Sequence, residues 1–188
     1  MLVRKATFAL LFATTLCATP VTYDTNGLFT GPDAIGGSLF NHGALVTFNN
    51  VTSVNVDSPT NISLGQVVVT PPSSGTAVFA GNTFTLSILE TSPSSGSGPT
   101  QAQNVSGTIT SASDTLDLVF SPTVIVIGTE TYTLQTTYEL VAPNTNRGVT
   151  TIQAFLTSAN TIIPEPRWLV LSGCVVLVAA VLFRKRKA

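Results

Sequence analysis

Between residues 20 and 163, hydrophobic and polar residues alternate with a period of two. From Thr83 to Ile88 the apolar side chains fall at every second position, and residues 116–120 and 132–140 repeat this pattern. Such alternation is typical of strands that turn one face toward a hydrophobic core. No segment of this region keeps apolar residues at helical spacing, and Thr, Val, Ile, Ser and Gly predominate over good helix formers. We therefore expect strands and essentially no helix.

Turn residues divide this region into about ten strands. Asn26-Gly27 suits a type I′ hairpin, and Gly128-Thr129 suits a type II′ turn. Longer breaks, rich in Pro, Ser, Gly or Asn, fall at residues 71–75, 93–99 and 143–148. The strands expected from this division span residues 21–24, 44–49, 51–57, 61–69, 76–80, 83–90, 103–110, 115–120, 123–127 with 130–141, and 149–157.

The number and length of these strands predict the fold class. Many short antiparallel strands without helices are typical of an all-β protein with a β-sandwich or jelly-roll architecture. Val124–Ile127 is apolar on both sides, which predicts a strand in the middle of the core. The region of 144 residues is long enough for one domain with a substantial core, which we assign to residues 20–160.

The N-terminal segment has the pattern of a secretory signal peptide. Two cations lie within residues 1–5, an eleven-residue apolar stretch covers residues 6–16, and small residues follow. We assign residues 1–19 to this signal, with cleavage after Ala18 or Thr19. The secretory translocon is therefore an expected partner.

The C-terminal segment has the pattern of a membrane anchor. The sixteen residues from Trp168 to Phe183 carry no charge and would make a helix of roughly 24 Å, against a hydrocarbon core of about 30 Å. Trp168 and Phe183 would lie at the two interfaces with the membrane lipid. Four cations follow, namely Arg184, Lys185, Arg186 and Lys187. The positive-inside rule keeps these cations in the cytoplasm and places the residues before Trp168 outside.

The residues just before this apolar segment carry a resemblance to a known family. Pro164, Glu165 and Pro166 favour an extended backbone, because the prolines lack an amide hydrogen and restrict the residues before them. Pro-Glu-Pro, a short apolar helix and a basic terminus together resemble the PEP-CTERM sorting signal of Gram-negative bacteria, a tail also described as an ice-binding protein C-terminal domain. A plain single-pass anchor with prolines in its linker is the alternative.

The resemblance implies a route for the protein. A membrane-embedded exosortase would recognise Pro164, Glu165 and Pro166 and cut nearby, and the protein would pass from the inner membrane to the cell surface or the extracellular matrix. The sorting signal would occupy residues 161–188, with a linker at 162–167, the transmembrane helix at 168–183 and the basic tail at 184–188.

Charge and cysteine usage restrict the exported domain further. Residues 20–163 contain eight carboxylates and one cation, Arg147, for a net charge of −7, although the whole chain has a net charge of −1. An acidic domain is repelled by phosphate backbones, which argues against a nucleic-acid partner. The two cysteines, Cys17 and Cys174, lie in the two end segments, so the domain has no disulfide.

Candidate chemistry within the domain is sparse. His42, the single histidine, lies in a predicted turn and is expected to be an exposed loop residue. Asp114 and Asp117 lie three residues apart and suit calcium, but the interpretation as two solvated carboxylates is preferred. Glu90, Glu130 and Glu139 are candidates for paired acid–base catalysis by residue type alone, and the alternation places Glu139 toward solvent. We expect no catalytic residue, no cofactor and no metal site, and hence no enzyme.

Two functions remain open. The first is a non-catalytic domain directed to the surface or the exopolysaccharide matrix. The second is a carbohydrate-binding or adhesive module on a plain membrane anchor. Sugar sites favour exposed aromatic residues, but the domain contains no Trp and three tyrosines, Tyr23, Tyr132 and Tyr138. Tyr132 and Tyr138 share a predicted core-facing register with Leu134 and Leu140.

Overall fold

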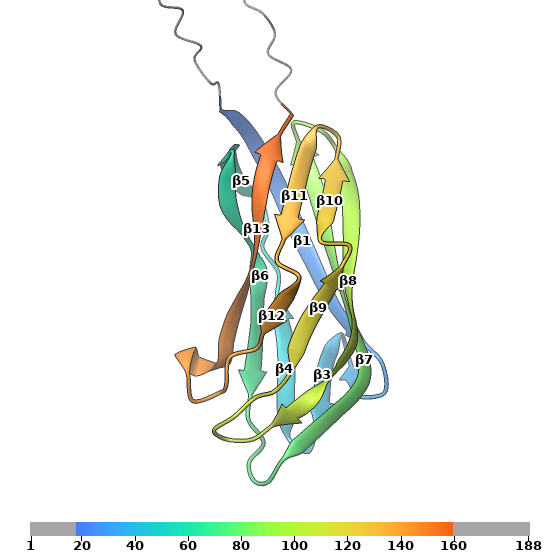
Figure 1. The fold of residues 1–188 in the computed structure, drawn as a ribbon, viewed down its shortest axis with the longest axis vertical. Coiled ribbons are helices and arrows are strands. Elements are labelled where there is room, and N and C mark those ends of the chain that lie inside the picture. Colours follow the sequence, from blue (N-terminus) through green and yellow to red (C-terminus); the bar gives the residue numbers. More distant parts are fainter. Residues whose placement is uncertain (1–17, 160–188) are drawn as a thin grey trace, which may run out of the picture.

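The computed structural model describes residues 18–159, which form two antiparallel β-sheets packed face to face (Figure 1). One sheet has six strands in the order β12-β9-β8-β7-β1-β5, and the other has seven in the order β10-β11-β13-β6-β4-β3-β2. The six are β1 (Thr19–Thr30), β5 (Val54–Ser58), β7 (Ala77–Ser92), β8 (Gly96–Ile109), β9 (Asp117–Ser121) and β12 (Thr137–Glu139). The seven are β2 (Ala34–Ile35), β3 (Ser38–Asn41), β4 (Ala44–Asn49), β6 (Thr60–Thr70), β10 (Val124–Ile127), β11 (Glu130–Leu134) and β13 (Val149–Ser158).

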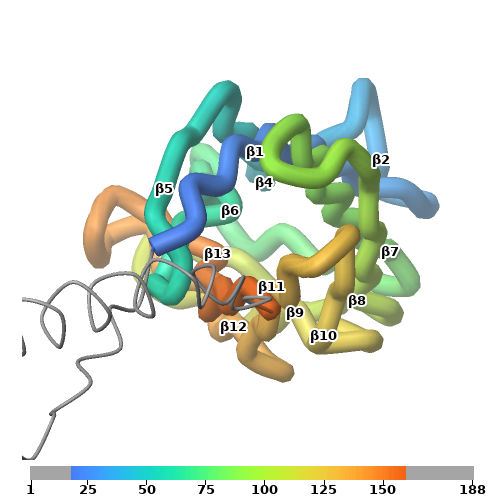
Figure 2. The backbone as a smooth tube through the Cα atoms, turned by 90° about the horizontal axis from the view of Figure 1, so that it is seen from above, coloured from blue at the N-terminus to red at the C-terminus, as the bar shows by residue number. Residues whose placement is uncertain are grey.

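The predicted all-β class and sandwich architecture are confirmed. One 3-10 turn, Asn146–Gly148, is the sole helical element among residues 18–159. The period-two pattern places one side of each strand in a shared core between the sheets. The backbone viewed along the long axis shows the two sheets facing each other (Figure 2). Phe84 lies at the centre of this core, with ring centroids 4.5 Å from Phe29, 5.1 Å from Phe48 and 6.1 Å from Phe120. Such aromatic pairs contribute about 0.5–1.5 kcal/mol each beyond their buried area.

The hairpin predicted at Asn26-Gly27 is wrong, because these residues continue straight through β1. They pair with Ser87 and Leu86 of β7. A Cβ on Gly27 would lie 2.2 Å from a ring carbon of Phe48 in the opposite sheet. Gly27 therefore provides room for a core side chain, and its amide donates to Oδ1 of Asn50 at 2.9 Å.

The loop predicted at residues 93–99 is also shorter than expected, because β8 already begins at Gly96. Gly98 pairs with Ile88 of β7, so the serine- and glycine-rich segment belongs to the sheet. A Cβ on Gly98 would lie 2.1 Å from Ile125, and one on Gly96 would lie 2.9 Å from Ile127. The absent side chains let the inward isoleucines of β10 reach the core.

The central strand predicted at Val124–Ile127 is instead β10, the edge of the seven-stranded sheet. Ile125 and Ile127 are buried, but Val124 and Val126 are 48% and 63% exposed.

The strands predicted at 76–80 and 83–90 are one strand, β7, with register shifts between Phe79 and Phe84. The short strands β2 and β3 were not predicted. The breaks at 71–75 and 143–148 and the turn at Gly128, whose φ is 60°, are confirmed.

Both ends of the described segment lie at the upper end of the sandwich in Figure 1, where β1 begins and β13 ends. Register supports this view, because Thr19 pairs with Ser58 and Leu156 pairs with Thr60, two residues further along the chain. No helix within residues 18–159 is long and apolar enough to cross a membrane. The predicted signal peptide at 1–19 lies almost entirely outside the described residues, and the tail at 161–188 lies wholly outside them.

Candidate functional site

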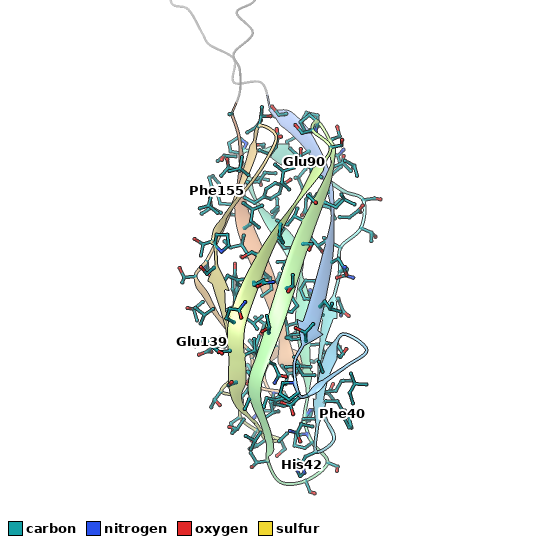
Figure 3. The ribbon with its side chains drawn as sticks, turned by 90° about the vertical axis from the view of Figure 1, so that its right-hand side faces the viewer. Phe40, His42, Glu90, Glu139 and Phe155 are labelled. Carbon is teal, nitrogen blue, oxygen red and sulfur yellow. The ribbon has the colours of Figure 1, made fainter. Side chains whose placement is uncertain are left out.

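The upper end of the sandwich contains two buried carboxyl groups from different sheets. Glu90 lies near the end of β7 and Glu130 begins β11, and both side chains are 0% exposed. Figure 3 shows Glu90 at this end, opposite the turn that carries His42. We call Glu90 and Glu130 the carboxyl pair. The structure thus brings two of the three glutamate candidates together.

Hydroxyl and amide groups surround the carboxyl pair. Tyr132 donates its hydroxyl to Oε2 of Glu90 at 2.7 Å, and the amide of Ser94 donates to Oε1 of Glu90 at 3.2 Å. Glu130 accepts from the Thr129 hydroxyl at 2.8 Å, the Ser158 hydroxyl at 3.0 Å and the Thr129 amide at 3.2 Å. A longer contact of 3.4 Å joins the Ser94 hydroxyl to Oε2 of Glu130. The donors come from β11 and the turn before it, from β13 and from the loop after β7, so the pair links the two sheets.

The two carboxyl groups differ in acidity. Burial raises the pKa of Glu90 to about 7, and the neighbouring charge of Glu130 adds to the rise, although the Tyr132 and Ser94 hydrogen bonds oppose it. Burial also acts to raise the pKa of Glu130, but hydrogen bonds from Thr129, Ser158 and Glu90 outweigh it and hold this pKa below the usual value. Burial, and then the adjoining Glu90, raises the pKa of Tyr132. Glu90 therefore keeps its proton to a higher pH than Glu130 does.

Two adjoining carboxyl groups of unequal acidity are the usual components of general acid–base catalysis. A catalytic role also requires contact with a substrate, however, and here both side chains are fully buried and bonded to protein groups. The arrangement favours a structural and pH-sensitive role. The alternation contained a signal for it, because Glu90 continues the inward series of Phe84, Leu86 and Ile88.

A second polar cluster lies near the lower end and contains Asp33, Asn41 and Asn82. Oδ2 of Asp33 accepts from the side-chain amide of Asn82 at 2.8 Å and the backbone amide of Ala80 at 3.3 Å. Oδ1 of Asp33 accepts from the side-chain amide of Asn41 at 3.1 Å, and the Asp33 amide donates to Oδ1 of Asn82 at 3.1 Å. Asn82 is 0% exposed. This Asp33 cluster fastens the turn after β1 to β3 and β7.

The structure separates the roles of Asp114 and Asp117. Asp114 was predicted to be solvated, but the structure shows it half-buried. Its Oδ1 accepts from the Leu116 amide at 2.6 Å, and its Oδ2 is buried without a hydrogen-bond partner. Burial raises the pKa of Asp114 to about 6, and the charge of Asp117 adds to the rise. Asp117 is exposed on β9, as predicted. Residues 18–159 contain no cluster of three or more metal-ligating His, Cys, Asp or Glu side chains.

The remaining predicted residues are placed as follows. His42 is exposed in the tight turn between β3 and β4, with a φ of 47°, and Glu139 is exposed on β12, so both predictions are confirmed. Tyr132 and Tyr138 are buried as predicted, and Tyr23 is buried as well. The exposed aromatic residues of the two sheets are phenylalanines, a residue type that was not among the predicted candidates for a sugar site. The tail residues lie outside the described residues, namely Pro164, Glu165, Pro166, Trp168, Phe183, Arg184, Lys185, Arg186 and Lys187.

Comparison of this chain with protein-family models, with curated proteins and with solved structures found no match.

Proposed function

We propose that the protein is an exported, non-catalytic β-sandwich that is directed to the cell surface or its exopolysaccharide matrix. Its C-terminal tail would hold it briefly in the inner membrane until an exosortase cuts near Pro164-Glu165-Pro166. The support from sequence is the order of an apolar leader, an acidic domain without cysteine, a Pro-Glu-Pro segment, an apolar run and four cations.

The position of the two ends of the described segment is the observation that carries this proposal. β1 begins at Thr19 and β13 ends at Ser158, both at the upper end of the sandwich (Figure 1). A leader and a tail attached there can be removed without cutting through a strand. At most, a cut after Thr19 would remove the first residue of β1. The rest of the sandwich and all of its loops at the lower end are free to project from the membrane. Such an arrangement suits a domain that is released whole after sorting.

The carboxyl pair supports the non-catalytic part of the proposal. Glu90 and Glu130 adjoin each other and are 0% exposed, so a substrate reaches neither without opening the upper end. A plain single-pass anchor carrying a binding or adhesive module is the second candidate, and it differs from the first in the fate of the tail.

Mass spectrometry of the mature protein, from strains with and without the exosortase, tests the sorting proposal. We expect the wild-type strain to release a protein that lacks residues 168–188, and the strain without exosortase to retain the full tail. Tails that remain attached in both strains would contradict the proposal and favour the plain anchor.

Two variants of the tail separate recognition from topology. Glu165→Ala should block maturation and leave full-length protein in the inner membrane. Replacement of Arg184, Lys185, Arg186 and Lys187 by glutamine should instead weaken cytoplasmic retention, because the C-terminus then carries no cluster of charges through hydrocarbon. This second variant should appear partly as uncleaved protein outside the inner membrane. Normal maturation of both variants would show that Pro-Glu-Pro is only a linker.

A further inference from the structure

The outer surface of the seven-stranded sheet has a shallow depression of about 270 Å³ near the upper end. Its floor crosses three neighbouring strands, because Thr133 of β11 pairs with Phe155 of β13, which pairs with Asn61 of β6. Gln153 and Gln135 complete the rim. Figure 3 shows Phe155 pointing away from the sandwich, on the side opposite the core. We call these five residues the Phe155 face.

The polar side chains of the Phe155 face are not used by the fold. The hydrogen bonds of Asn61, Gln135 and Gln153 within residues 18–159 involve their backbone atoms only. By contrast, Gln101 and Gln103 on the other sheet bond to Thr85 and to each other. Each free amide group offers two donors and one carbonyl acceptor. Three such groups therefore surround one phenylalanine ring that is 46% exposed.

The charge around the depression restricts what it can bind. The outward positions of β6, β10, β11 and β13 hold no Asp, Glu, Lys, Arg or His. The outward carboxylates of the strands belong instead to the six-stranded sheet, at Asp24, Asp57, Asp117 and Glu139. Glu139 lies on the same side as Phe155 in Figure 3 but further toward the lower end. A charged ligand on the Phe155 face would therefore find no oppositely charged side chain at the outward positions of these strands.

We propose that the Phe155 face binds an uncharged glycan chain. A sugar ring presents C–H groups on its flat face and hydroxyl groups around its edge. The exposed ring of Phe155 packs against the C–H groups of the sugar. The amides of Asn61, Gln135 and Gln153 and the hydroxyl of Thr133 form hydrogen bonds with its hydroxyl groups. The volume lies just below the range of about 300–1,000 Å³ for ligand pockets, so one sugar unit lies in it while the chain continues across the sheet. This proposal does not depend on how the tail is processed.

Binding is measured on the full-length chain, in a detergent without a sugar headgroup, against an array of neutral and uronate-containing oligosaccharides. The neutral glycan that binds most tightly is then titrated by calorimetry. We expect binding to neutral glycans alone. Phe155→Ala should weaken it at least about 10-fold, and Gln153→Ala by about 3-fold to 10-fold.

Phe40→Ala is the matched control, because Phe40 is 47% exposed but lies near the lower end of the sandwich (Figure 3). It should leave the affinity unchanged. Phe155→Tyr keeps the ring and should keep binding, which separates loss of the site from loss of the fold. Thermal melting of each variant checks that the sandwich remains folded.

Three results would overturn the proposal. The first is no binding of any neutral glycan by folded wild-type protein. The second is equal loss of binding in Phe155→Ala and Phe40→Ala. The third is a wild-type dimer in sedimentation that Phe155→Ala disrupts and Phe40→Ala leaves intact, since this would assign the Phe155 face to contact between two copies of the chain.

Discussion

At the upper end of the sandwich, Glu90 and Glu130 occupy one buried site, whereas near the lower end Asp33 lies among amide groups without a second carboxyl group. Both sites link strands that lie far apart in the sequence. The carboxyl pair accepts hydrogen bonds mainly from hydroxyl groups, and burial raises the pKa of its Glu90 to about 7, while the Asp33 cluster is supplied by backbone and side-chain amides. Two acidic sites of similar structural use are thus satisfied by different donors, and the raised pKa of Glu90 makes the carboxyl pair pH-sensitive. Four predictions test this contrast.

Asn82→Ala should have the largest effect. Asn82 is fully buried and both donates to and accepts from Asp33, so the change leaves Asp33 without its shortest donor. We expect the free energy of unfolding to fall by about 3 kcal/mol, measured by urea denaturation. The control is Asn55→Ala, which removes one exposed hydrogen bond to Thr22. A loss for Asn82→Ala no larger than for this control would contradict the contrast.

The second prediction concerns the pH dependence of the wild type. The pKa of Glu90 is raised to about 7 from 4.5, so the folded state holds its proton more tightly than the unfolded chain does. Its contribution to stability is complete below about pH 4.5 and is lost as the pH rises through 7. The contribution of Glu130 to stability has the opposite pH dependence. Its pKa is lowered in the folded state, so this contribution is lost on acidification. Stability should therefore be greatest near pH 5, and Glu90 should lower it by about 2 kcal/mol between pH 5 and pH 8.

Urea titrations at several pH values measure this fall, and Glu90→Gln should remove most of it, because the amide cannot ionise. Asp114, whose pKa is raised to about 6, acts in the same direction. Asp114→Asn should therefore remove a separate part of the slope, which lies between about pH 4 and pH 6. An unchanged slope in Glu90→Gln would show that the carboxyl pair is not the pH-sensitive site.

Tyr132→Phe should have a smaller effect that depends on pH. The Tyr132 hydroxyl lowers the pKa of Glu90 by donating to its carboxylate, so its removal should move the pH-dependent loss of stability to higher pH. We expect a loss of about 1 kcal/mol at pH 8 and less at pH 5. Tyr23→Phe is the control, because Tyr23 donates to the backbone carbonyl of Ser63 at 2.8 Å and should lose the same stability at both pH values. Equal behaviour of the two variants would argue against a role for Tyr132 in the titration.

Glu139→Gln should have the smallest effect. Glu139 is exposed on the edge strand β12 and makes no hydrogen bond with its side chain among residues 18–159. The melting temperature should match that of the wild type in differential scanning calorimetry. A lower melting temperature would mean that a surface carboxylate, and not only the buried ones, governs stability.

The sequence alone was sufficient to predict the all-β class, most strands and the inward or outward direction of many side chains. Period-two alternation is a local property, so the burial of Tyr132 and Tyr138 and the exposure of Glu139 follow from neighbouring residues. The same register contained the signal that Glu90 points inward, although Glu90 was singled out by residue type alone. The acidic charge and the two end segments were also visible in the sequence, and they carry the proposed route of export.

Tertiary structure decided the rest, because it depends on which strands from distant parts of the chain meet. Asn26-Gly27 has the composition of a turn, yet Phe48 of the other sheet requires a glycine in the middle of a strand. Glu90 and Glu130 lie in different sheets, so the raised pKa of Glu90 follows from sheet packing and not from spacing. Phe155 and Asn61 are far apart along the chain and become neighbours only because β13 pairs with β6. Local alternation determined which way each side chain points, and the pairing and packing of strands determined what it meets there.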